Sequence, residues 1–219
     1  MKESLTIADS KRAFHKAFPH VIPPIYRRVA DELLVELHLL SHQKGFKSDL
    51  IFAIGLTKVF DTFTRGYKPE RHLVPLFEAL CRSNSFDPVS IREQAEIALQ
   101  SIEGHTFDEV SNWLRNKDTE TPNKISNELK SLSMNSNHYS RLISIGLLSI
   151  LEQSINKPTL EKDRASLENL IVETSENLGF SKNRVERDLN QYSSNIDKIS
   201  QALELMREAI EHDLSLIHI

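Results

Sequence analysis

The sequence is poor in glycine and cysteine, and it has no long hydrophobic run. Six glycines among 219 residues leave few positions for tight turns at positive φ, which disfavours short β-hairpins. The single cysteine, Cys81, cannot form an internal disulfide, and its apolar neighbours predict a buried core residue rather than a nucleophile. The longest strongly apolar run, residues 142–151, is far shorter than the ~20 residues that span a bilayer. These absences predict a helical protein in a reducing compartment, with at most peripheral contact to a membrane.

The motifs of several common chemistries are also missing. The glycines lie at least ten positions apart, which excludes a dinucleotide-binding G-x-G-x-x-G, a P-loop and a nucleophile elbow. None of the nine histidines has a glutamate three residues before it, as di-iron bundles require, and no H-E-x-x-H occurs. The net charge of -4 provides no overall attraction to nucleic acid. We therefore expect no catalytic centre, no cofactor, no metal site and no nucleic-acid partner.

One histidine pair leaves an alternative open. His38 and His42 are four residues apart on a predicted helix, so both side chains could reach one metal ion. This pair is the basis of an alternative hypothesis, a metal-dependent enzyme. No third ligand lies nearby in the sequence, and two surface histidines are the simpler interpretation.

Apolar residues recur at helical spacing through most of the chain. Stripes of this kind cover residues 25–40, 52–63, 91–102 and 125–132, and residues 139–155 are apolar on nearly all sides, which is typical of a central helix. Asp87 and Pro88 predict the start of the helix over residues 91–102, and Thr106 and Glu109 form a predicted capping box at the start of a short helix. Polar loops are expected at residues 117–123 and 131–137, and no run alternates long enough to predict a strand. The predicted fold class is all-α, a single helical bundle.

The C-terminal third carries an unbroken heptad seam, which predicts a long helix. Its apolar positions alternate in spacing between four and three residues. They are Val185, Leu189, Tyr192, Ile196, Ile199, Leu203, Met206 and Ile210. The seam is either a projecting coiled-coil arm that dimerises or recruits a partner, or a helix packed on its own bundle. A second stripe over residues 160–178, ended by Gly179, offers an antiparallel partner within the chain. We therefore divide the chain into a bundle domain (1–157) and a helical hairpin (158–213) with a coiled-coil segment at about 181–213.

Two charged clusters are candidate partner sites. Arg27 and Arg28 fall in the first turn of a predicted helix, where cations oppose the helix dipole, and Asp31 and Glu32 are their expected partners within the chain. Residues 61–71 form a charged corner between two helices. This corner is either a salt-bridged turn packed around a tyrosine or a docking surface, because loops often carry recognition.

Several of these segments resemble the signature blocks of the thylakoid-formation family, also called the photosystem II biogenesis family. The blocks are DSKRAF (9–14), IYRRV to ELHLL (25–40), FDTFTRGYKPER (60–71), FEALC (77–81), FDP (86–88) and RLISIGLLSILE (141–152). They occur in the right order and cover most of the chain. The chain begins close to the first block, so it resembles the cyanobacterial form, which needs no transit peptide.

This resemblance implies a non-catalytic factor for thylakoid biogenesis and photosystem II assembly and repair. It implies an adaptor that binds and stabilises the membrane FtsH-type protease, at the cytoplasmic face of the thylakoid membrane and in peripheral contact with it. A homodimerising structural coiled-coil protein is the alternative. The candidate docking residues lie in the signature blocks and are Lys11, Arg12, Arg27, Arg28, Asp61, Arg65, Tyr67, Glu70 and Arg71.

The heptad seam is broken at Asp213, where the spacing calls for an apolar residue, and the chain then ends in the six residues 214–219. One back-translation of these residues reproduces the end sequence of a transposase adapter used in DNA library preparation. We therefore expect them to be a sequence artefact, with the natural chain diverging after about Asp213. A genuine apolar tail is the alternative.

Overall fold

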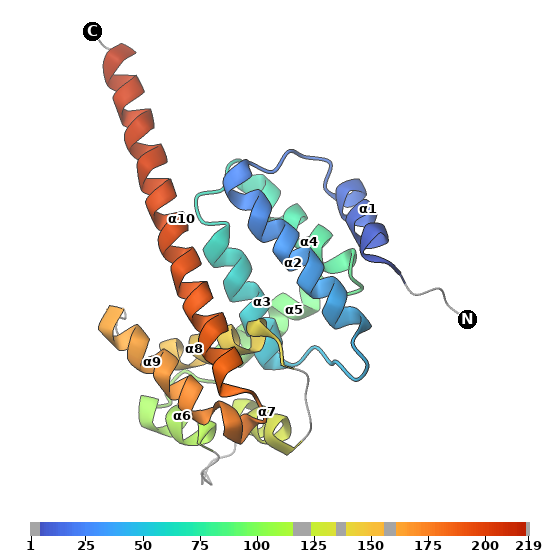
Figure 1. Ribbon diagram of the computed structural model, residues 1–219, viewed down its shortest axis with the longest axis vertical. Coiled ribbons are helices and arrows are strands. Elements are labelled where there is room, and N and C mark those ends of the chain that lie inside the picture. The colour runs from blue at the N-terminus through green and yellow to red at the C-terminus, as the bar shows by residue number, and fades with distance from the viewer. Residues whose placement is uncertain (1–4, 116–123, 135–138, 156–160, 218–219) are drawn as a thin grey trace.

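A computed structural model describes residues 5–115, 124–134, 139–155 and 161–217 (Figure 1). Over these residues the chain forms ten α-helices, two short 3₁₀ helices and no strand, so the all-α prediction is confirmed. The α-helices are α1 (Ile7–Ala17), α2 (Pro24–His42), α3 (Leu50–Phe63), α4 (Leu73–Arg82), α5 (Pro88–Gln100), α6 (Phe107–Leu114), α7 (Lys124–Met134), α8 (Arg141–Ser154), α9 (Glu161–Thr174) and α10 (Lys182–Ile217). The 3₁₀ helices are η1 (Glu70–His72) and η2 (Ser175–Leu178). None of the described helices is both long and apolar enough to cross a membrane.

Side-chain caps define where several helices begin. Thr106 and Glu109 form the predicted capping box of α6, in which the Glu109 carboxylate accepts from the Thr106 amide at 2.7 Å. Thr6 and Asp9 form a second capping box at the start of α1. Asp87 caps α5, whose first residue is Pro88, in agreement with the sequence pattern. These bonds satisfy amides that have no acceptor within their helix.

One predicted loop boundary is wrong. The polar segment 131–137 was expected to be a loop, but α7 continues to Met134. Leu129 and Leu132 are both buried, and their spacing of three residues places them on one face of the helix. Burial of Leu132 therefore keeps the chain helical beyond Ser131 despite its polar neighbours. The other predicted loop, residues 117–123, lies outside the described residues.

The core is centred on α3 and α8, which pack against each other more extensively than any other pair of described helices. Both helices are buried on almost every side. The helices α2, α4 and α5 gather on the α3 side, whereas α6, α9 and the first part of α10 pack on the α8 side. Lys58 of α3 and Glu152 of α8 form an ion pair at 2.8 Å across the contact.

Two glycines allow the backbones of α3 and α8 to touch. A Cβ atom on Gly55 would lie 1.8 Å from the carbonyl oxygen of Leu142, and one on Gly146 would lie 2.1 Å from the carbonyl oxygen of Ile51. Each glycine thus faces the backbone of the opposite helix at a distance that no side chain permits. This reciprocal contact fixes how closely the two central helices pack.

The substitution Gly146→Ala tests this contact. The added methyl group must push α8 away from α3, and such overpacking outweighs the better helix propensity of alanine. We expect the free energy of unfolding, measured by urea denaturation, to fall by about 2 kcal/mol net. The control is Gln153→Ala on the exposed side of α8, for which a change within about 0.5 kcal/mol is expected. Equal stability of the two variants would contradict the close backbone contact.

A partly buried N-cap gives a pH-dependent prediction. Asp49 caps α3 by accepting from the Phe52 amide at 2.7 Å, and burial raises the pKa of its carboxyl to about 6 despite this bond. The folded state therefore favours the protonated carboxyl. The stability linked to it is complete below pH ~4 and is lost as the pH rises through 6. An asparagine side chain retains the cap without the charge, so Asp49→Asn should be about 1–3 kcal/mol more stable than the parent at pH 7.5, and nearly equal at pH 4, in denaturant titrations.

Candidate functional site

Three segments that are distant in sequence meet at the corner between α3 and α4. The Tyr26 hydroxyl, at the start of α2, donates to the backbone carbonyl of Arg65 at 3.2 Å. The Tyr26 and Tyr67 rings lie 5.0 Å apart, and both are buried. Gly66 has a φ of 78°, and its position leaves room for the side chain of Leu203 of α10, 3.1 Å from where a Cβ would lie. We call residues 61–72 together with Tyr26 and Leu203 the corner.

The charged residues of the corner fall into two groups. Asp61 accepts both guanidinium nitrogens of Arg92 on α5, at 2.7 and 2.8 Å, and Lys68 pairs with Glu70. Arg65 and Arg71 are exposed, and neither has an ion-pair partner among the residues that the structure describes. Of the candidate docking residues in this corner, Tyr67 is buried and packs against Tyr26. Its hydroxyl has no hydrogen-bond partner among the described residues, and burial raises its pKa.

The remaining candidate residues lie on α1 and α2. Lys11 is exposed, and Arg12 pairs with Asp9 at 3.0 Å on the exposed side of α1. Arg28 forms the expected ion pair with Glu32 at 2.9 Å.

Arg27 departs from its expected pairing. It donates to the backbone carbonyl of Ile22 at 3.3 Å instead of pairing with Asp31. The predicted partner was wrong because a backbone carbonyl of the loop before α2 lies within reach of the guanidinium.

The heptad seam of α10 is buried at one end and exposed at the other. Its first three positions, Val185, Leu189 and Tyr192, are buried against the bundle, and Tyr192 packs edge-on against Phe63 of α3 at 5.6 Å. Ile196, Ile199 and Leu203 are partly buried against the same core. Met206 is 49% exposed and its neighbour Leu205 is 66% exposed, and this end of α10 extends alone beyond the other helices in Figure 1. Ile210 lies outside the residues whose side chains are described. The inner part of the seam is therefore packed on the bundle of its own chain, whereas the outer part projects from it.

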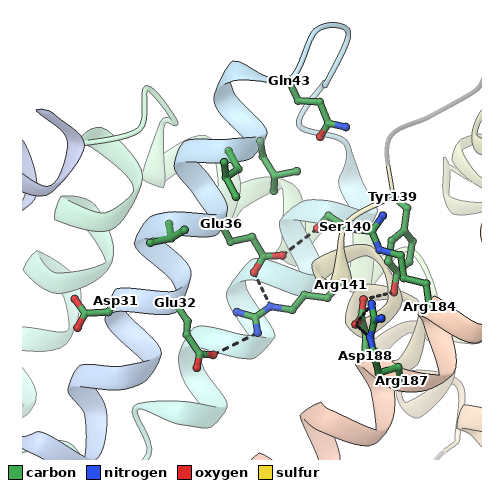
Figure 2. Close-up of a pocket in the computed structure, with 13 residues that line it drawn as sticks. Asp31, Glu32, Glu36, Gln43, Tyr139, Ser140, Arg141, Arg184, Arg187 and Asp188 are labelled. Atoms are coloured by element: carbon green, nitrogen blue, oxygen red, sulfur yellow. Dashed lines mark hydrogen bonds and ion pairs between the residues drawn. The ribbon is translucent and has the colours of Figure 1, made fainter. Parts of the chain in front are cut away.

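A polar cleft lies where α2, the start of α8 and the start of α10 meet (Figure 2). Its volume is ≈ 750 Å³. Arg141 projects from α8 between two carboxylates of α2, with 2.6 Å to Glu36 and 3.4 Å to Glu32. Burial raises the pKa of the Glu36 carboxyl, and the Arg141 guanidinium partly opposes this shift. The pair joins α2 to α8 across more than a hundred residues of sequence.

The other wall of the cleft is a network of neutral and charged groups. Tyr139 donates to Asp188 of α10 at 3.0 Å, accepts from Ser144 at 2.8 Å, and has the guanidinium of Arg184 4.7 Å above its ring. Burial raises the Tyr139 pKa, so its hydroxyl remains a donor over the physiological range. All these groups have partners within the chain, so the network holds the first turns of α10 against the segment before α8.

Sequence patterns alone missed this cleft. Arg141 stands at the beginning of the most apolar helix and Glu36 stands among leucines, and such isolated charges in apolar stretches are the signal that could have identified a buried pair.

The histidine pair does not form a metal site in the described part of the chain, where no group of three or more metal-binding side chains occurs. His38 is buried and its Nδ1 lies 2.9 Å from the Ser10 hydroxyl, so the prediction of two surface histidines is wrong for His38. The wrong assignment arose because α1, which covers this face of α2, has no sequence pattern that links it to His38. His42 is exposed. Cys81 is buried, as predicted, and burial raises its thiol pKa to about 12.

In the described part of the chain, the polar clusters are thus contacts between helices, while the corner arginines and the outer part of α10 are exposed. A model of the family described as "Thylakoid formation protein" matches residues 6–215. The chain belongs to this family of thylakoid biogenesis factors. It is 49% identical to Protein Thf1 of Prochlorococcus marinus (strain MIT 9313), an alignment that covers 97% of this chain and 87% of that protein. It is 48% identical to Protein Thf1 of Parasynechococcus marenigrum (strain WH8102), with 97% and 92% covered.

A solved structure has the same fold. The structure of Psb29 superimposes with a TM-score of 0.78 at 31% sequence identity, and the match covers 98% of this chain and 100% of that one. The resemblance inferred from the signature blocks is thus confirmed.

Two leucines on α10 test how the helix is held at the corner. Leu203 packs against Gly66, whereas Leu205 is exposed on the same helix. Leu203→Asp should lower the melting temperature by about 3–6 °C because it places a charge against the apolar corner. Leu205→Asp should change it by less than about 2 °C. Equal melting temperatures in calorimetry would show that α10 is not packed on the corner.

Proposed function

We propose that this protein is an adaptor that binds and stabilises a membrane FtsH-type protease during photosystem II assembly and repair. It acts by binding and not by chemistry. Family membership supports the thylakoid role, and the resemblance of the signature blocks supports the protease and photosystem II as partners. In this proposal the protein lies at the cytoplasmic face of the thylakoid membrane and contacts the membrane peripherally.

The observation that carries the adaptor proposal is the uncovered apolar surface on the outer part of α10. Leu205 and Met206 are large, exposed apolar side chains that follow Leu203, which packs against the core. A helix that presents apolar residues to solvent at the end of an otherwise packed seam has the form of a recognition element. Its anchored first half holds the outer half in a defined direction, which lowers the entropy lost when a partner binds.

The corner supplies charge beside this helix. Arg65 and Arg71 are exposed, and Leu203 connects their segment to α10 at Gly66. In the proposal these arginines, with Lys11, Arg12, Arg27, Arg28, Asp61 and Glu70 of the candidate docking set, provide polar contacts at the rim of the interface. Charges at a rim increase the rate of association more than they increase affinity.

A homodimer is the second candidate, and the continuous heptad spacing through Met206 favours it. A second copy would cover the same apolar surface that the adaptor proposal assigns to the protease. Sedimentation distinguishes the two, because the adaptor proposal expects a monomer.

The decisive experiment is affinity capture from detergent-solubilised cyanobacterial thylakoids, with FtsH-type subunits quantified by mass spectrometry. The double substitution Leu205→Asp with Met206→Asp should reduce captured protease at least tenfold, because two charges replace the exposed apolar contact. The matched control, Asn190→Asp with Gln201→Asp, adds the same charges at exposed positions of α10 and should leave capture unchanged.

Reversal of the corner charges, Arg65→Glu with Arg71→Glu, should reduce capture more strongly at low salt than at high salt. A wild-type protein that sediments as a dimer, and that retains its protease in both double variants, would reject the adaptor proposal in favour of the homodimer.

A further inference from the structure

A second groove lies between α4 and α5, against the last turns of α3. Its volume is ≈ 540 Å³, within the range of binding clefts in proteins. The floor is formed by the buried rings of Phe60 and Phe77, which pack edge to face at 5.0 Å. The walls carry Val74 of α4 and Val89 of α5, which are 68% and 51% exposed. Apolar side chains therefore line this groove from its floor to its rim.

The single arginine of the groove is already neutralised. Arg92 lies over the Phe77 ring at 4.3 Å and is bound by both oxygens of Asp61. These contacts hold the guanidinium over the Phe77 ring and compensate its charge. Arg92 is therefore part of the wall, and no net positive charge remains there.

The rim of the groove is acidic. Glu93 and Glu96 on α5 have no ion-pair partner among the described residues, and Glu78 on α4 has only a 3.9 Å contact with Arg82. The carboxylates on α4 and α5 lie on both sides of the apolar floor. The groove thus combines an apolar centre with uncompensated negative charge, which disfavours an anionic lipid surface or a nucleic acid.

We propose that this groove binds an amphipathic helix of a partner protein, one that carries lysine or arginine beside its apolar stripe. A groove between two helices accepts the side-chain ridge of a third helix, and helix-in-groove binding uses apolar anchors at every third or fourth residue. The carboxylates of α4 and α5 would meet the flanking cations and fix the direction of the bound helix. This inference goes beyond the proposed adaptor role and involves neither α10 nor the corner arginines, so either proposal can fail alone.

The probe is a fluorescein-labelled synthetic helix of about 18 residues, with leucines at helical spacing, lysines beside them and alanine elsewhere. Its anisotropy is titrated with the full chain. A dissociation constant in the micromolar range is expected. Glu93→Lys with Glu96→Lys should raise it at least tenfold, or ~1.4 kcal/mol. The control is Glu173→Lys with Glu176→Lys, at two exposed positions that are also three residues apart. It should change the dissociation constant less than twofold.

An apolar variant provides an independent measurement. Val89→Ser removes only the aliphatic wall and should raise the dissociation constant about threefold or more, while a probe with glutamate at every lysine should not bind. Absence of binding, or equal weakening by both charge-reversed pairs, would overturn the proposal. A wild-type dimer in sedimentation that Glu93→Lys with Glu96→Lys converts to a monomer would assign the groove to a second copy instead and would also overturn it.

Discussion

The contact between the backbones of α3 and α8 determines the spacing of the other helices. Gly55 and Gly146 each face a carbonyl group of the opposite helix, and no other residue fits at either position. Among the other helices, α5 packs on α3, and α6, α9 and α10 pack on α8. The corner and the polar cleft are consequences of this arrangement, because both form where a helix of one side meets a helix of the other.

Paired charges in this protein hold helices together. Ion pairs join α8 to α2 through Arg141 and α3 to α5 through Asp61 and Arg92, and a hydrogen bond from Tyr139 to Asp188 joins the segment before α8 to α10. Each pair connects segments far apart in sequence. Removing Arg141 would leave the partly buried Glu36 carboxyl without compensation, which costs more than the intact pair contributes. These pairs therefore specify how the helices are arranged, while apolar burial provides most of the stability.

Helix positions were largely predictable from sequence because local signals define them. The capping box at Thr106, the Asp87-Pro88 start and the heptad spacing of α10 each act over a few residues, and all three agree with the structure. The burial of His38 and the carbonyl contact of Arg27 were not predictable. Both depend on α1 and the segment after it, and their position relative to α2 is set by tertiary packing. The groove between α4 and α5 was missed for the same reason, since its lining comes from three helices.

The graded burial of α10 has a geometric consequence. A straight α-helix rotates a heptad stripe by about 20° for every seven residues, so the seam turns by roughly 40° between Leu189 and Leu203. The stripe that faces α8 at its start therefore points to a different side by the time it leaves the bundle. A partner that packs on the seam at Leu203 and Met206 would therefore approach α10 from a different side than the bundle does. The packing of the inner turns of α10 thus determines the direction in which the outer turns face. Inserting or deleting a single residue between them would rotate the outer surface about the helix axis by about 100° without altering its composition.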